Sequence, residues 1–254
     1  MDLGLSGRKA CITGATRGIG RAIAERLAAE GCDVAICART SAAVDAAVKA
    51  LGGQGVKAWG RALDVADAAA LRAWVADAAG ALGGLDILVC NASALVSGGT
   101  AEAYRAAFET DLLHTLNAAE AARPILERSS AGAIVAIASI SAVEDYGWEE
   151  SAYGTMKAAM LYALKSLADH LAPKGVRVNV VSPGAIYFAG GVWARTERDN
   201  EAAFRAVLAA NPMGRMGRPE EIADVVAFVA SPRASFMAGA NVVVDGAFTR
   251  RIPN

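Results

Sequence analysis

Seven short apolar runs recur along this chain, and longer Ala-rich segments with helical spacing separate them. Strands that alternate with helices in this way pair in parallel and carry helices on both faces of the sheet. The chain is therefore predicted to be an α/β protein with a doubly wound, seven-stranded parallel sheet. The predicted strands are residues 10–13, 34–38, 56–63, 87–90, 133–138, 176–181 and 242–244, and the predicted helices are residues 19–30, 42–51, 68–82, 104–126, 153–171 and 220–230.

No low-complexity linker or composition break interrupts this alternation. Residues 1–254 are therefore expected to form a single doubly wound domain. The one long departure covers about residues 187–211, between the sixth predicted strand and the last predicted helix. Because long insertions at the carboxyl end of a strand often cover an active site, we expect this segment to be a substrate lid.

Lys and Arg together number 25 and Asp and Glu 26, which leaves no positive excess to attract phosphate backbones or anionic lipid. We therefore expect neither nucleic acid nor a membrane as a partner. No segment has the pattern of a signal peptide or a membrane span, so a cytoplasmic location is expected. The histidines lack partners at metal-ligand spacing, which predicts no metal site, and the cysteines lack paired spacing, which predicts reduced, buried thiols. These residues are His114, His170, Cys11, Cys32, Cys37 and Cys90.

A glycine-rich turn follows the first predicted strand and opens the first predicted helix. It reads Gly-Ala-Thr-Arg-Gly-Ile-Gly, with glycines at Gly14, Gly18 and Gly20. Glycine lets the backbone approach a pyrophosphate closely and adopt positive φ, while the free N–H groups of a helix N-terminus attract the anion. The turn is a candidate phosphate site, with an ordinary tight turn as the alternative.

Two arginines bear on the choice of cofactor. In a dinucleotide-binding fold the residue after the second strand meets the adenosine ribose, where an acid suits NAD and an arginine suits the 2′-phosphate of NADP. Here Ala38 offers no carboxylate, whereas Arg39 and Arg17 can both pair with a phosphate. The sequence predicts a preference for NADP(H), with NAD(H) as the alternative if both arginines only meet solvent.

A phenol and an ammonium lie four residues apart on a predicted helix, as Tyr153 and Lys157. That spacing places both side chains on one helix face, where the ammonium favours the ionised phenol and assists proton transfer. Such pairs also arise by chance. However, Ser139 directly follows the predicted strand 133–138, and strand ends of a doubly wound sheet face the ligand crevice.

The glycine loop, Ser139 and the Tyr153/Lys157 pair resemble those of the short-chain dehydrogenase/reductase family, and within it the members similar to 3-oxoacyl-acyl carrier protein reductase. The resemblance spans nearly the whole chain and implies a Rossmann fold. It implies an oxidoreductase that moves a hydride between a nicotinamide cofactor and a small carbonyl or alcohol substrate, with NADPH-dependent ketone reduction as the expected reaction. It also implies a homotetramer, or else a homodimer.

The same resemblance assigns the cofactor contacts. Asp64 is expected to meet the adenine, Asn91 to steady the central strand, and Ile186 to contact the carboxamide through its backbone. The family pattern Asn-Asn-Ala-Gly is altered here at Cys90 and Ser93. The expected cofactor-binding residues are Gly14, Thr16, Arg17, Gly18, Ile19, Gly20, Arg39, Asp64, Val65, Asn91, Ala92, Tyr153, Lys157, Pro183, Gly184 and Ile186.

The resemblance also assigns catalytic roles. Tyr153 is expected to donate the proton, Lys157 to bind the nicotinamide ribose, and Ser139 to hydrogen-bond the substrate oxygen, with Ser141 as the substitute. Asp111 stands where the family usually has an asparagine that anchors a water leading protons to the lysine. We expect Asp111 to serve this relay, and the alternative is that it only bends or caps its helix.

Aromatic residues cluster on either side of the catalytic segment, in a chain that is only 6% aromatic. This clustering predicts an apolar substrate pocket, unless the aromatics pack the lid against its own domain or a neighbouring subunit. The expected pocket residues are Ser93, Tyr146, Trp148, Tyr187 and Trp193. The same residues also allow two other functions: a related nucleotide-sugar epimerase or dehydratase, and a non-catalytic cofactor sensor or scaffold with the same fold.

Overall fold

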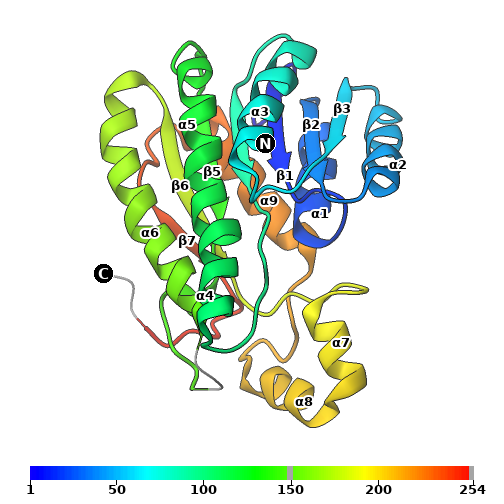
Figure 1. Ribbon diagram of the computed structural model, residues 1–254, viewed down its shortest axis with the longest axis vertical. Helices are drawn as coiled ribbons and strands as arrows, with labels where there is room; N and C mark the ends of the chain where they lie inside the picture. The colour runs from blue at the N-terminus through cyan, green and yellow to red at the C-terminus, as the bar shows by residue number, and fades with distance from the viewer. Residues whose placement is uncertain (148–150, 252–254) are drawn as a thin grey trace.

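The computed structural model describes residues 1–147 and 151–251. All seven strands pair in parallel in one sheet, in the order β3-β2-β1-β4-β5-β6-β7 (Figure 1). The predicted seven-stranded, doubly wound sheet is thereby confirmed. The strands are β1 Lys9–Thr13, β2 Asp33–Ala38, β3 Ala58–Ala62, β4 Ile87–Cys90, β5 Ala133–Ile137, β6 Arg177–Pro183 and β7 Asn241–Val244.

Helices cover both faces of the sheet and divide the core into two layers (Figure 1). Helices α1 (Gly18–Ala29), α2 (Ser41–Gly52) and α9 (Pro219–Ala230) pack on one face. Helices α3 (Ala68–Leu82), α5 (His114–Leu126) and α6 (Ala152–Leu171) pack on the other. Adjacent strand residues alternate between the layers, as side chains on a strand must. Single 3₁₀ turns lie at Ile140–Ala142, Ala172–Lys174 and Pro232–Ala234.

The predicted helix 104–126 is not continuous. Helix α4 (Ala101–Ala107) passes into a π-helical turn, Phe108–Leu113, before α5 begins. A π-turn inserts an extra residue per turn and so re-aims the side chains that follow it. The residue it turns inward is Asp111, which is completely buried.

The segment 187–211 is largely helical. It holds α7 (Val192–Asp199) and α8 (Glu201–Ala210), which lie together beyond the carboxyl ends of the strands (Figure 1). Asn200 separates them, and its Oδ1 accepts a hydrogen bond from the Ala203 N–H at 3.1 Å, which caps α8. The insertion that the sequence marks as a candidate lid thus consists largely of a helix pair.

The four cysteines are free and buried. Burial raises the pKa of the Cys32, Cys37 and Cys90 thiols to about 12 and raises that of Cys11 as well, which makes all four poor nucleophiles. Within the described residues, no helix is both long and apolar enough to cross a bilayer, and no three His, Cys, Asp or Glu side chains are grouped as metal ligands would be.

Candidate active site

A cavity of about 910 Å³ opens at the carboxyl ends of the strands. Most of the predicted site residues line it: Gly14, Thr16, Arg17, Ile19, Gly20, Arg39, Asp64, Val65, Asn91, Ala92, Ser93, Ser139, Tyr146, Tyr153, Lys157, Pro183, Gly184, Ile186 and Trp193. Gly18, Asp111 and Tyr187 are not part of its wall. The predicted pocket residue Trp148 lies outside the described residues.

The glycine loop at the base of the cavity has little room for side chains. Gly14 and Gly18 have φ of +67° and +55°, and a Cβ on Gly14 would lie 3.0 Å from the Ala92 backbone. A Cβ on Gly20 would collide with the amide of Asn91. That amide donates to the carbonyls of Thr13 and Gly14 at 3.1 and 3.0 Å, so it ties β1 to the loop after β4.

Helix α1 begins at this loop with its first N–H groups uncapped. Arg17 is the N-cap residue, and its side chain makes no capping hydrogen bond. The first N–H groups of a helix have no partner within the helix, and together with the helix dipole they form an anion site. The loop therefore fits the pyrophosphate of a dinucleotide.

The buried His114 side chain is hydrogen-bonded to Thr13, the residue that precedes this loop. Thr13 Oγ1 accepts from the N–H groups of Asn91 and Ala92 at 3.0 and 3.2 Å, so its own proton is donated to His114 Nε2 at 3.0 Å. His114 Nδ1 then donates to the Thr110 carbonyl at 2.6 Å. Burial lowers the pKa of His114 to about 4, so the ring is neutral near pH 7. Sequence reasoning missed this network, because its partners are far apart in the chain.

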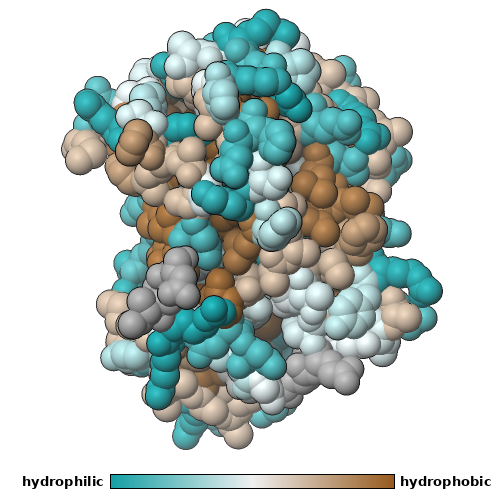
Figure 2. Space-filling model, turned by 90° about the vertical axis from the view of Figure 1, so that its left-hand side faces the viewer, coloured by the Kyte–Doolittle hydropathy of each residue, from teal (hydrophilic) through white to brown (hydrophobic). Residues whose placement is uncertain are grey.

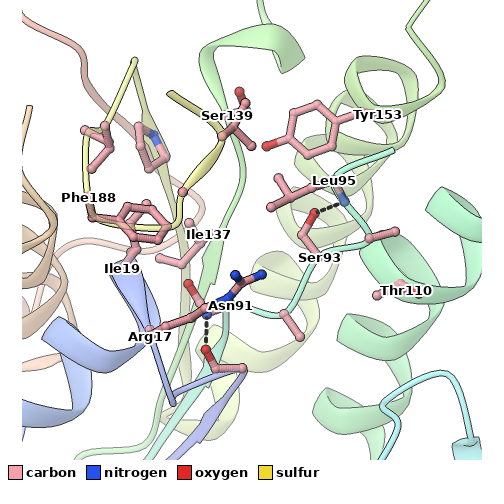
Figure 3. Close-up of a pocket in the computed structure, with 18 of the residues that line it drawn as sticks. Arg17, Ile19, Asn91, Ser93, Leu95, Thr110, Ile137, Ser139, Tyr153 and Phe188 are labelled. Atoms are coloured by element: carbon pink, nitrogen blue, oxygen red, sulfur yellow. Dashed lines mark hydrogen bonds between the residues drawn. The ribbon is translucent and has the colours of Figure 1, made fainter. Parts of the chain in front are cut away.

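The predicted catalytic residues converge on the cavity. Ser139 follows β5, and its Oγ accepts from the Ser141 N–H at 3.1 Å. Tyr153 and Lys157 lie one turn apart on α6, with the Lys157 ammonium 5.5 Å from the centre of the Tyr153 ring. In Figure 3 the Tyr153 hydroxyl points across the cavity toward Ser139. A carbonyl oxygen placed between these two hydroxyls could receive a hydrogen bond from each.

Asp111 lies behind the cavity wall, in direct contact with the lysine. Its Oδ1 is 3.1 Å from Lys157 Nζ, and its Oδ2 accepts from the Ala94 N–H at 3.2 Å. Lys157 Nζ also donates to the Ile137 carbonyl at 2.8 Å. The Asp111 and Lys157 side chains are 0% and 2% exposed. The carboxylate therefore joins the lysine to the loop after β4.

The adenosine end of the cavity carries Arg39 and Asp64. Arg39 is exposed and directly follows Ala38, the last residue of β2. An acidic side chain at position 38 would repel a 2′-phosphate, but this position is an alanine. Asp64 Oδ1 accepts from the Ala66 N–H at 3.0 Å, which fixes the turn after β3. This end of the cavity therefore carries a guanidinium and no carboxylate at the position after β2 that bears on the choice of cofactor.

The wall near Ser139 is aromatic. Tyr146 packs edge-to-face on Phe248 with ring centres 5.3 Å apart, and Trp193 of α7 lies in the same cluster. Phe248 was not foreseen, because it follows the last strand in a stretch without periodicity. The chain beyond it is anchored to the loop after β5, where the Arg250 N–H donates to Glu144 at 3.1 Å and the Arg251 guanidinium donates to the Val143 carbonyl.

Tyr187 packs away from the cavity. Its hydroxyl donates to Glu197 at 2.5 Å, and its ring stands edge-on to Phe204 of α8 at 6.1 Å. Tyr187 therefore joins the two helices of segment 187–211 to the chain that leaves β6. Ser93 Oγ accepts from the Leu95 N–H at 3.1 Å beneath Tyr153 (Figure 3), in a turn where Leu95 has a φ of +49°.

Comparison with known proteins adds to this geometry. A family model described as enoyl-(acyl carrier protein) reductase matches residues 14–249. The chain is 37% identical over 249 residues to isoepoxydon dehydrogenase patN of Penicillium expansum, covering 97% of this chain and 96% of that protein. These matches run through the glycine loop, the Tyr153/Lys157 pair and segment 187–211.

Two solved structures carry bound nicotinamide cofactors. L-sorbose reductase of Gluconobacter frateurii, complexed with NADPH and L-sorbose, is 32% identical with a TM-score of 0.92, covering 99% of this chain and 100% of that one. A 7α-hydroxysteroid dehydrogenase complexed with NADH is 28% identical with a TM-score of 0.91, covering 99% and 98%. Proteins with this fold thus bind either dinucleotide.

Proposed function

The chain belongs to the short-chain dehydrogenase/reductase family and is an oxidoreductase of CH–OH and C=O groups, and we propose that it reduces a small, uncharged ketone with NADPH. The observation that carries the proposal is that Ser139, Tyr153 and Lys157 face one cavity together with the glycine loop. A proton donor and a dinucleotide site thereby share one space, as hydride transfer to a carbonyl requires.

In this reaction the bound cofactor supplies the hydride. The Tyr153 hydroxyl donates its proton to the substrate oxygen as negative charge develops there, and the Ser139 hydroxyl donates a hydrogen bond to the same atom. Lys157 has three N–H groups, of which two meet Ile137 and Asp111. The third can bind the nicotinamide ribose, and the ammonium lies 5.5 Å from the centre of the Tyr153 ring.

Preference for NADPH rests on Arg39. Its guanidinium can form charge-assisted hydrogen bonds to a 2′-phosphate, and Ala38 leaves room for that group. Arg39→Ala should weaken NADPH by about tenfold and leave NADH nearly unchanged, because a charged hydrogen bond is worth about 1.5 kcal/mol. Fluorescence titration of both cofactors measures this, and tighter binding of NADH by the wild type would contradict the preference.

The substrate side favours an uncharged, apolar-faced ketone. Tyr146, Trp193 and Phe248 offer ring surfaces near Ser139, and such walls hold compact organic substrates. Segment 187–211 is proposed as the lid over them. Isoepoxydon dehydrogenase and L-sorbose reductase are named for small oxygenated substrates, which is consistent with this size.

The direct test follows NADPH absorbance, with NADH in parallel, against ketoacyl thioesters, cyclic ketones, ketosugars and aromatic ketones. We expect turnover with at least one uncharged ketone and NADPH. Tight cofactor binding with no turnover across the panel would contradict the reductase assignment and favour a sensor that keeps the fold.

Assembly as a homotetramer, or else a homodimer, is also proposed. The β7 edge of the sheet faces the viewer in Figure 2, where apolar surface gathers across the middle of the molecule. Tyr162 of α6 and Phe236 before β7 are 82% and 103% exposed. Light scattering measures the assembly, and a monomer would contradict it. The four free cysteines fit a reducing compartment such as the cytoplasm.

A further inference from the structure

Segment 187–211 touches the glycine loop at two points. The ring of Phe188 covers Gly18 so closely that a Cβ there would lie 2.5 Å from the ring, and in Figure 3 the ring lies beside Ile19. Arg17 Nη1 is 3.5 Å from the carbonyl oxygen of Gly190. The turn between β6 and α7 therefore lies against the end of the cavity that fits a pyrophosphate.

A second guanidinium reaches the same oxygen. Arg195 of α7 donates from Nη1 to the Gly190 carbonyl at 3.1 Å, and it lines the cavity. Two cations thus share one neutral acceptor beside an uncapped helix N-terminus. In the part of the chain that the structure describes, neither Arg17 nor Arg195 takes part in an ion pair.

The two guanidinium groups share a neutral carbonyl oxygen, although a guanidinium binds an anion more strongly. A carbonyl oxygen carries only a partial charge, whereas phosphate oxygens bind guanidinium through shorter and stronger charge-assisted hydrogen bonds. The first N–H groups of α1 attract the same anion. An anion at this point would meet backbone donors from the glycine loop and one arginine from each side.

We propose that Arg195 binds the diphosphate of the cofactor together with Arg17, so that segment 187–211 supplies part of the cofactor site. The inference rests on the proposed function and assigns a ligand role to a residue that sequence reasoning did not single out. Arg39 then recognises the ribose phosphate, and Arg17, which the sequence also offered as a partner of that phosphate, is assigned to the diphosphate because its guanidinium lies beside Gly190. Arg195 therefore contributes equally to NADH and NADPH binding.

Two fragments separate these roles. ADP carries the diphosphate without a 2′-phosphate, and 2′-AMP carries the 2′-phosphate without the diphosphate. Each is titrated by competition against NADPH fluorescence, so the readout is binding and not turnover. Arg195→Gln should weaken ADP about tenfold and leave 2′-AMP unchanged, whereas Arg39→Gln should do the reverse.

Further variants exclude a merely structural role. Glutamine is neutral and shorter than arginine, so Arg195→Gln removes both the positive charge and the contact with the Gly190 carbonyl. Arg195→Lys keeps the charge and should restore most of the ADP affinity. Arg198 of the same helix pairs with Asp199 and does not line the cavity, so Arg198→Gln serves as the matched control and should change the affinity for neither fragment.

The binding results distinguish failure of the Arg195 assignment from failure of the proposed function. Unchanged ADP affinity in Arg195→Gln, or weakened 2′-AMP instead, would overturn the assignment of Arg195 while the reductase proposal stands. A wild-type protein that binds neither ADP nor NADPH would overturn both.

Discussion

The ammonium of Lys157 and the carboxylate of Asp111 form an ion pair at 3.1 Å that is almost completely shielded from solvent. The pair forms because the π-turn at Phe108–Leu113 directs Asp111 toward α6. The second carboxylate oxygen, Oδ2, accepts a hydrogen bond from the Ala94 N–H, next to the turn that begins at Ser93. One carboxylate therefore links Lys157, which we propose to be catalytic, to the loop after β4.

Replacing this carboxylate should affect both stability and catalysis. Asparagine has one oxygen in place of two, so Asp111→Asn leaves either Lys157 or the Ala94 N–H without its partner. An uncompensated buried charge costs about 3 kcal/mol of unfolding free energy. Urea unfolding measures this loss, with Asp169→Asn on the exposed side of α6 as a control that should lie within about 0.5 kcal/mol of the wild type.

The same variant tests the proton relay. If Asp111 assists proton transfer through Lys157, the pH–rate profiles of wild type and Asp111→Asn differ in position as well as height. Superimposable profiles would remove Asp111 from the relay and leave it a structural role.

His114 should make the fold sensitive to acid. Its folded-state pKa of about 4 lies below the ordinary value of 6.5, because burial disfavours the charged ring. A base with a lowered pKa stabilises the fold fully above pH 6.5, and this contribution is lost as the pH falls toward 4. The loss amounts to about 3 kcal/mol, since one pKa unit corresponds to about 1.4 kcal/mol.

Urea unfolding between these pH values measures the effect. His114→Gln keeps a hydrogen-bond donor and an acceptor but cannot titrate. Its unfolding free energy should therefore be lower than that of the wild type near pH 7 and should fall less on acidification. An equal acid loss in wild type and variant would show that other groups cause it.

The chain keeps an alanine where its backbone favours glycine. Ala247 has a φ of +65°, which costs an alanine about 1–2 kcal/mol. Ala247→Gly should raise the unfolding free energy by about 0.5–1 kcal/mol after the extra chain entropy of glycine is counted. The matched control is Ala206→Gly, at an exposed position in the middle of α8, which should lower it by about 1 kcal/mol. A destabilised Ala247→Gly would show that the left-handed conformation costs little here.

Sequence alone predicts the sheet and most of the cavity wall, because strand alternation and the glycine loop are local patterns. It does not predict the π-turn, since the apolar spacing of residues 104–126 suits a continuous helix. The turn places Asp111 against Lys157, which lies far away in the sequence, so no local pattern reports this contact. The resemblance identified Asp111 as unusual, but only the fold shows which charge it meets.

Contacts between distant segments are the other part that sequence leaves open. Phe248 reaches Tyr146 only because β7 ends beside β6, next to the substrate side of the cavity. Arg195 reaches the Gly190 carbonyl, which Arg17 of the glycine loop also approaches, because segment 187–211 folds as two helices over the strand ends. Neither residue lies in a periodic pattern or a spaced motif, so no local signal identifies them.

The central claim is that Tyr153 donates the proton to the substrate oxygen. The most direct measurement compares NADPH-linked ketone turnover by wild type and Tyr153→Phe, with the Kd of NADPH measured on both. Tyr153→Phe removes the proposed proton donor but keeps an aromatic ring next to the Lys157 ammonium. The account predicts a fall in turnover of at least about 10²-fold with cofactor affinity nearly unchanged. Near-normal turnover by Tyr153→Phe would contradict it.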